Sequence, residues 1–244
     1  MNAILVELKR LQEVDDQLRQ TRKTQAEAEA RLTQAAEALK ARESRLAAAQ
    51  GGLKAMQSRH RDLEGELTDL SAKQKHNETR QMNVKSDQEY AALAKEAAFL
   101  SGRISELEDE TLELLDGVEK QEAELVALTA AVAEESTAYR SLAEATALVQ
   151  QSGQAQLTDL TARREAITGS LPALQLRQYD EIARVRHGLA VTAAAEGLCL
   201  ACRLGFPPQI FNELQRNEKI LTCPNCNRII FWRDHPDFGE EASR

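Results

Sequence analysis

A heptad repeat of leucines is the sequence feature that most constrains how this chain can fold. One apolar stripe begins at Ile4 and recurs every seven residues, at Leu11, Leu18, Gln25, Leu32, Leu39, Leu46, Leu53, His60 and Leu67. A second stripe begins at Leu93 and recurs at Leu100, Leu107, Leu114, Gln121, Leu128, Glu135, Leu142 and Val149. Such spacing places one apolar seam along each of two long helices, and each seam needs another helix to cover it.

The polar segment between the two stripes predicts a turn. Residues 76–86 carry no heptad, and Ser86 with Glu89 fits a capping box at the start of a helix. The first helix is therefore expected to end near residue 76 and the second to begin at Ser86. Two helices of similar length with a capped restart favour an antiparallel hairpin over residues 1–171, with its tip at about residues 77–86. A parallel dimer of coils with a break in the middle is the alternative.

Charge and aromatic residues are distributed unevenly along the chain. Residues 172–244 hold equal numbers of basic and acidic side chains, so the net charge of −8 belongs to residues 1–171. Four of the five phenylalanines and the single Trp232 lie near the C-terminus. The sequence starts without a signal peptide and has no apolar run of membrane-spanning length, so we expect a cytoplasmic protein that does not contact a membrane.

All four cysteines lie in two CxxC pairs near the C-terminus. They are Cys199, Cys202, Cys223 and Cys226. Two CxxC pairs about twenty residues apart are typical of a tetrahedral zinc site with four thiolate ligands. Two disulfides and an iron–sulfur cluster are the alternatives, and a reducing compartment disfavours the disulfides. Four thiolates fill the coordination sphere, so a single zinc ion would be structural.

Short strands around the cysteine pairs predict a zinc ribbon at residues 189–235. A connecting helix is expected at residues 172–188 and a flexible tail at residues 236–244. Strands are expected at residues 189–193, 219–222 and 228–232, with a turn of helix at residues 210–216 after Pro207 and Pro208 block an earlier start. The fold class is thus mainly α, a long antiparallel coiled-coil hairpin with a small C-terminal β zinc ribbon.

Two stretches of the chain resemble a known family. These are residues 83–93, with the acidic run that begins at Leu107, and the second cysteine pair from Cys223 to Phe231. The chain resembles the bacterial coiled-coil proteins with a C-terminal four-cysteine zinc ribbon. That resemblance implies a helical hairpin with the ribbon at its base. For some members it also implies RNA binding and association with the nitrogen-type alternative sigma factor. Arg203 and Asn227 stand where many zinc knuckles have glycine, so Arg203 predicts a less regular first knuckle.

Basic and aromatic side chains of the ribbon are the candidate binding residues. They are Arg203, Arg216, Lys219, Arg228, Phe231, Trp232 and Arg233. One interpretation is a small basic face with aromatic platforms for single-stranded nucleic acid. Alternation along the last strand predicts that one aromatic faces inward and one stays exposed. The alternative is that arginines beside the cysteines balance the thiolate charge.

A second group of candidate binding residues lies at the hairpin tip. This group consists of Lys73, Lys75, Arg80 and Lys85. The acidic coil elsewhere would repel a phosphate backbone, so RNA or DNA would have to approach at the tip or at the ribbon. Factors that insert a coiled coil into the RNA polymerase secondary channel carry acidic tips, and this tip is mixed or basic.

The sequence predicts a non-enzymatic protein. His60, His76, His187 and His235 are scattered, and no nucleophile motif, phosphate-binding loop or small-molecule site is present. We expect a nucleic-acid-binding regulator of transcription or of a post-transcriptional step. The alternative is a protein–protein adaptor, such as a partner of a sigma factor or RNA polymerase that does not touch nucleic acid.

Overall fold

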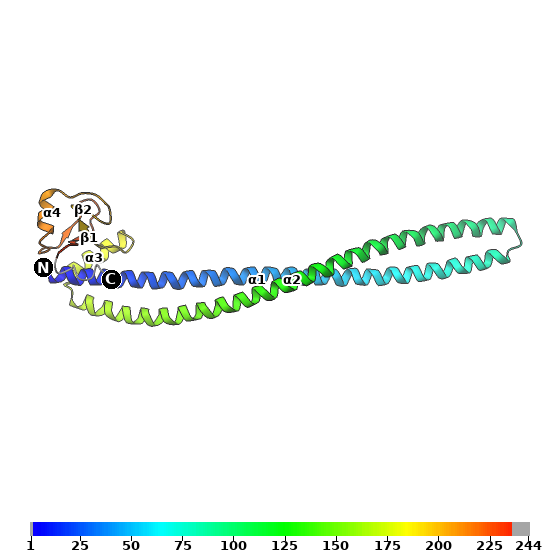
Figure 1. Ribbon diagram of the computed structural model, residues 1–244, viewed down its shortest axis with the longest axis horizontal. Coiled ribbons are helices and arrows are strands. Elements are labelled where there is room, and N and C mark those ends of the chain that lie inside the picture. The colour runs from blue at the N-terminus through cyan, green and yellow to red at the C-terminus, as the bar shows by residue number, and fades with distance from the viewer. Residues whose placement is uncertain (1, 236–244) are drawn as a thin grey trace. The chain divides into compact units, whose positions relative to one another are not determined.

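Two very long helices make up most of the computed structural model, which describes residues 2–235. Helix α1 spans Ala3–Asn83 and helix α2 spans Asp87–Ser170. Both helices are uninterrupted, and only residues 84–86 connect them (Figure 1). The predicted mainly α class with a small C-terminal sheet is confirmed. The predicted tail at residues 236–244 lies outside the described residues.

The chain divides into two compact units, each containing part of both long helices. The arm unit comprises residues 32–143, and the ribbon unit comprises the first 31 residues together with residues 144–244. In the arm unit, Arg45 binds Glu124 and Arg59 binds Glu110, both with N–O distances of 2.8 Å. The partner's residue number falls as that of α1 rises, so the helices are antiparallel within one chain. These contacts exclude the parallel dimer.

Helix α1 extends seven residues beyond its predicted end. The prediction of an end near residue 76 is wrong because polar side chains near the tip bond to each other instead of breaking the helix. Buried Asn77 donates to Glu96 of α2 at 2.9 Å and accepts from Gln81 at 3.0 Å. Helix α2 begins directly after Ser86, whose carbonyl accepts from the amide of Tyr90. Within residues 2–235, neither bond of the predicted capping box is present: the amide of Glu89 does not donate to the Ser86 hydroxyl, and the amide of Ser86 does not donate to the Glu89 carboxylate.

The ribbon unit combines a third helix with a small mixed sheet. Helix α3 spans Ala173–Val185, and a short helix α4 spans Pro208–Leu214. Strands β1 (Val191–Ala195), β2 (Leu198–Cys199), β3 (Leu221–Thr222) and β4 (Ile229–Trp232) form a sheet in the order β2-β1-β4-β3. Strands β1 and β4 are parallel, and the other two pairings are antiparallel.

Helix α4 corrects one feature of the predicted ribbon. Pro208 was expected to prevent a helix, but it is the first helical residue, where its missing N–H costs no intrahelical hydrogen bond. The amide of Phe211 then bonds to the carbonyl of Pro207 at 3.2 Å. The helix ends at Leu214, which is buried against the cysteine cluster.

The sheet is covered on both faces. One face packs on the start of α1 and on α3, through a cluster that contains Leu5, Leu8, Leu11, Tyr179 and Ile229. The opposite face packs on the cysteines and on α4, through a cluster that contains Ile230 and Leu214. The first turns of α1 are therefore part of the ribbon unit's core, and they hold the zinc ribbon against the hairpin helices of the same unit. No helix within residues 2–235 has an apolar run sufficient for a bilayer span.

Candidate metal centre and ribbon surface

Each cysteine pair lies in a tight turn closed by the same two backbone hydrogen bonds. The amide of Arg203 bonds to the carbonyl of Cys199 at 2.7 Å, and that of Asn227 bonds to Cys223 at 2.8 Å. The first cysteine of each pair also donates its amide to a carbonyl five residues later, that of Leu204 or Arg228. The two knuckles are thus equivalent in backbone geometry.

A left-handed residue follows the second cysteine of each pair. Arg203 has a φ of 60° and Asn227 a φ of 58°. Asparagine adopts this conformation readily, whereas an arginine pays about 1–2 kcal/mol for it. The prediction of a less regular first knuckle is wrong, because the hydrogen bonds of the turn impose the same backbone on Arg203 as on Asn227.

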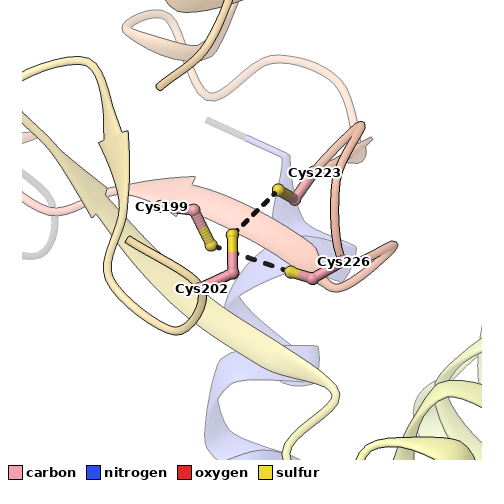
Figure 2. Close-up of side chains that lie close together, drawn as sticks. All are labelled: Cys199, Cys202, Cys223 and Cys226. Carbon is pink, nitrogen blue, oxygen red and sulfur yellow. Dashed lines mark hydrogen bonds between the residues drawn. The ribbon is translucent and has the colours of Figure 1, made fainter. Parts of the chain in front are cut away.

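The four sulfur atoms converge on one point. The Sγ atoms of Cys199 and Cys226 are 3.9 Å apart, and those of Cys202 and Cys223 are 3.7 Å apart (Figure 2). All four ligand atoms lie within 4.8 Å of one another. A zinc–sulfur distance near 2.3 Å gives a tetrahedron with edges of ~3.8 Å, so the spacing fits one zinc ion. The cysteines are free of disulfide bonds.

The electrostatics of the site show why the cluster needs a cation. Burial raises the pKa of the Cys199 thiol to about 12 and also raises the pKa of Cys223. Burial also acts to raise the pKa of Cys226. Hydrogen bonds from the backbone amide and the side chain of Arg228 outweigh burial, so the pKa of Cys226 is lowered to about 7. Four thiolates in this position would repel one another, and zinc supplies the charge that makes their joint deprotonation favourable.

Two arginines support the second knuckle. Arg228 donates from Nε to the carbonyl of Leu189 at 2.9 Å, while its hydrogen bonds favour the thiolate of Cys226. Arg186, just after α3, donates from Nε to the carbonyl of Cys226 at 2.9 Å. Arg228 is therefore committed to the ribbon's own structure, as the charge-balancing interpretation predicts.

The aromatic residues of β4 differ from the predicted arrangement. Alternation predicted one exposed aromatic, but Phe231 and Trp232 are both half-buried because each face of the sheet is covered. Phe231 lies beneath Lys9 of α1, with 6.0 Å between the ammonium nitrogen and the ring centre. Trp232 makes an edge-to-face contact with Phe211 of α4, with ring centres 5.1 Å apart. Neither ring is a free stacking platform.

The other predicted binding residues fall into three groups. Lys219 and Arg233 are exposed but form ion pairs with Glu213 and Asp234, at 2.7 and 2.8 Å. Arg203 and Arg216 are exposed and have no ion pair within residues 2–235. The tip residues Lys73, Lys75, Arg80 and Lys85 are exposed in the arm unit, which is a separate unit from the ribbon.

Sequence reasoning missed the polar residues that anchor the ribbon to the helices of its unit. The buried amide of Gln12 accepts from the amides of Ala190 and Val191, at 2.7 and 3.0 Å, and donates to the carbonyl of Gly188 at 2.9 Å. Asp15 accepts from Arg164 of α2 at 2.7 Å and from the hydroxyl of Tyr179 at 2.9 Å. A signal was present, since Asp15 follows Leu8 by seven residues and so places a charge on the apolar side of the helix, where it needs polar partners.

Sequence reasoning also did not predict three exposed leucines around the first knuckle, the turn that holds Cys199 and Cys202. Leu198, Leu200 and Leu204 expose 41%, 46% and 52% of their surface. The amide of Leu200 bonds to Ala193 and the carbonyl of Leu204 bonds to Cys199, so the backbone beneath these side chains is fixed.

Comparison with known proteins agrees with this geometry. Residues 11–188 match the model of the CT398-like coiled-coil hairpin domain, and residues 198–230 match that of the C4-type zinc ribbon domain. This chain belongs to the CT398-like coiled-coil hairpin family. The zinc ribbon match and the sulfur geometry together confirm a four-cysteine site for one structural zinc ion. The matched descriptions name a hairpin and a ribbon, and neither is an enzyme family.

Solved structures of this type share the fold across almost the whole chain. CT398 from Chlamydia trachomatis is 17% identical with a TM-score of 0.79, covering 94% of this chain and 97% of its own. A protein from Mycobacterium smegmatis is 20% identical with a TM-score of 0.68, covering 95% and 100%. HP0958 from Helicobacter pylori is 17% identical with a TM-score of 0.60, covering 95% and 98%. No curated protein sequence matches this chain.

Proposed function

We propose that this CT398-like protein is a non-enzymatic adaptor in bacterial transcription, and that its zinc ribbon binds a partner protein through the first knuckle. The observation that carries the proposal is the exposure of Leu198, Leu200 and Leu204 on a backbone fixed by the metal site. Exposed apolar side chains gathered on a rigid support are typical of protein interaction sites. The zinc ion would act by holding these leucines in place.

The coverage of β4 favours a protein partner over a stacked nucleic acid. Phe231 and Trp232 are half-buried, and Arg228 is engaged by Leu189 and Cys226. Stacking on aromatic rings and exposed basic groups supplies much of the affinity of single-stranded nucleic acid for small domains. The resemblance to the sigma-factor-associated family makes the nitrogen-type alternative sigma factor the first partner to test.

RNA or DNA binding by the ribbon is the second candidate function. Arg203 and Arg216 support it, because both guanidinium groups are exposed and lack ion pairs within the described part of the chain. Two basic groups would give weak and strongly salt-dependent binding. This function would regulate a transcript directly and would require no partner protein.

Two double variants separate these functions. Leu200→Ser with Leu204→Ser removes the apolar surface, whereas Arg203→Gln with Arg216→Gln removes the free basic groups. Binding of purified sigma factor and RNA polymerase is measured by biolayer interferometry, and RNA is recovered from cells by ultraviolet crosslinking. We expect the leucine variant to weaken protein binding about tenfold or more and the arginine variant to leave it unchanged.

The reverse result would establish the second candidate. If the wild-type protein recovers specific transcripts and only the arginine variant loses them, the adaptor proposal is wrong. Zinc content measured on both variants keeps the comparison interpretable, since each must retain one zinc per chain. All four substituted positions are exposed, so neither variant removes a buried side chain.

A further inference from the structure

The negative charge of the chain is concentrated in one short part of the arm unit. Residues 104–125 of α2 contain nine carboxylates and one lysine, a net charge of −8 that equals the net charge of the whole chain. About six turns of one helix thus carry a negative charge equal to that of the whole chain. Clustered like charges destabilise a helix by repulsion, so an adjacent opposite charge would be favourable.

Only some of these carboxylates are neutralised by neighbours. Glu110 and Glu124 bind Arg59 and Arg45 of α1, at 2.8 Å each. Arg103 binds Glu106 at 2.9 Å, and Lys120 binds Asp116 at 2.5 Å. The other five carboxylates of this segment form no ion pair within residues 2–235. They are Glu108, Asp109, Glu113, Glu119 and Glu122.

Large apolar side chains are exposed on the same segment. Leu112, Leu115 and Val126 expose 65%, 39% and 73% of their surface. Leu112 and Leu115 are three residues apart, and Val126 follows Leu115 by about three helical turns, so all three lie on one flank of α2. The inward seam is made by other residues, among them buried Leu107.

Three of the carboxylates that form no ion pair within residues 2–235 lie on that same flank. Glu108 precedes Leu112 by four residues, and Glu119 follows Leu115 by four residues, so each is one turn from a leucine on the same side of the helix. Glu122 precedes Val126 by the same spacing, and it accepts a hydrogen bond from Gln57 of α1 at 3.5 Å. We define the α2 flank as Glu108, Leu112, Leu115, Glu119, Glu122 and Val126. It is an apolar stripe bordered by acids.

We infer that the α2 flank binds a basic amphipathic helix of a partner protein. Apolar residues of such a helix would cover Leu112, Leu115 and Val126, and its lysines or arginines would meet Glu108 and Glu119. This is the packing of a third helix against a two-helix coil. Charge complementarity selects the occupant, because the same acids repel nucleic acid, anionic lipid and the α2 flank of a second copy. This surface is separate from the ribbon leucines and does not depend on the proposed function.

A defined peptide tests this assignment with the full-length, zinc-loaded protein. The probe is a fluorescent helical peptide of about three heptads, with leucine at positions a and d and lysine elsewhere. We expect it to bind the wild-type protein at physiological ionic strength. Leu112→Ser with Leu115→Ser should weaken binding about tenfold or more, since serine cannot replace the buried apolar contact. A peptide with glutamate in place of lysine should not bind.

Matched variants distinguish this site from general attraction to an acidic coil. Leu148→Ser removes an equally exposed leucine of α2, and Leu200→Ser with Leu204→Ser removes the ribbon leucines. Both should leave peptide affinity within about twofold of wild type. Glu108→Gln with Glu119→Gln should weaken binding about fivefold or more, because each removes a charge contact at the bound helix.

Two results would overturn the inference. One is a loss of affinity that is the same for Leu148→Ser as for the Leu112 and Leu115 variant. The other is sedimentation showing that the wild-type protein self-associates and that only the Leu112 and Leu115 variant is monomeric, which would make a second copy the occupant. Failure of the ribbon variants in the earlier sigma-factor assay would leave this result unaffected, so the two proposals fail separately.

Discussion

The ribbon unit and the arm unit are stabilised in different ways. In the ribbon unit α1, α2, α3 and a sheet enclose a three-dimensional core, in which Leu5, Leu8, Tyr179 and Ile229 are completely buried. In the arm unit the fully covered apolar side chains are spaced along a two-helix seam. They are Leu63, Leu93, Leu100 and Leu107. Two helices can shield only a narrow stripe, so most arm positions are exposed and most seam positions are only half-buried. The ribbon unit is thus sensitive at single residues, whereas the arm distributes its stability.

Zinc removal should have the largest effect, and it should unfold the ribbon unit while leaving the arm unit folded. Structural zinc contributes on the order of 10–16 kcal/mol in small zinc-binding modules, far more than a short sheet gains by burial. We expect chelation, or Cys223→Ser, to unfold the ribbon and change the fluorescence of Trp232. The helical circular dichroism of the arm should remain. Leu204→Ser, at an exposed position of the first knuckle, is the control. An unchanged Trp232 signal in a metal-free protein would show that packing on α1 suffices.

Leucine truncation at two positions of α1 compares how much one side chain stabilises each unit. Leu8→Ala should cost about 2–5 kcal/mol because the side chain is completely buried in the ribbon unit. Leu53→Ala should cost about 1 kcal/mol, since this seam residue of the arm is half-exposed and gives up less apolar burial. Urea unfolding followed by Trp232 fluorescence and by circular dichroism measures both. Equal costs would contradict the different burial of the two leucines, and coincident fluorescence and circular dichroism transitions would mean that the two units unfold as one.

The heptads and cysteine pairs were sufficient to predict the hairpin and the zinc ligands. Each spacing favours one geometry, a helical seam for the heptads and a tetrahedral site for the cysteine pairs. The end of α1 was not predictable in this way. Asn77 and Gln81 are polar and bond to each other within α1, but the bond from Asn77 to Glu96 exists only once the hairpin has formed.

The burial of β4 could not be predicted for a related reason. Alternation shows that Phe231 and Trp232 lie on opposite faces, but it does not show what covers each face. The first turns of α1 cover Phe231, although they are more than two hundred residues away in sequence. Asp15, seven residues after Leu8, was an indirect clue that the start of α1 packs on more than one helix, because a charged residue on the apolar side implies polar partners, here Arg164 and Tyr179.

Alkaline pH should destabilise the ribbon unit specifically. Burial, and then the adjacent carboxylate of Asp15, raise the pKa of Tyr179 well above its usual value near 10. Below that value the hydroxyl keeps its proton in both folded and unfolded chains, so it produces no pH dependence. Above about pH 10 the Tyr179 hydroxyl of the unfolded chain loses its proton while that of the folded chain keeps it. The free energy of unfolding therefore falls as the pH rises.

Comparison with Tyr179→Phe isolates this titration. The variant lacks the hydroxyl that bonds to Asp15, so its unfolding free energy should fall less steeply between pH 9 and 11 (a window of about one unit on either side of the usual tyrosine value). Urea unfolding across that window measures both slopes. Identical slopes would contradict a raised pKa, whatever the stability of the variant at neutral pH.

Glycine replacement should give the smallest effects, with opposite signs in the two units. Gly51 and Gly52 lie in the middle of α1 in the arm, where an added methyl group would meet nothing within 4 Å. Alanine there should stabilise the arm by about 0.5–1 kcal/mol per site, because it lowers the entropy of the unfolded chain. Gly153 of the ribbon unit lies under Gln25, where a methyl group would come 2.5 Å from Nε2.

Gly153→Ala should therefore destabilise the ribbon unit. The side chain of Gln25 donates to the carbonyl of Gln150 at 3.1 Å, and Gln150 returns a bond to the carbonyl of Gln25 at 3.2 Å. Moving the side chain of Gln25 aside would break the first of these two bonds, at a cost of about 1 kcal/mol that outweighs the gain in helix propensity. Thermal unfolding by circular dichroism compares the variants. If Gly153→Ala proved as stabilising as Gly52→Ala, the helices near Gln25 would be no more closely packed than those of the arm.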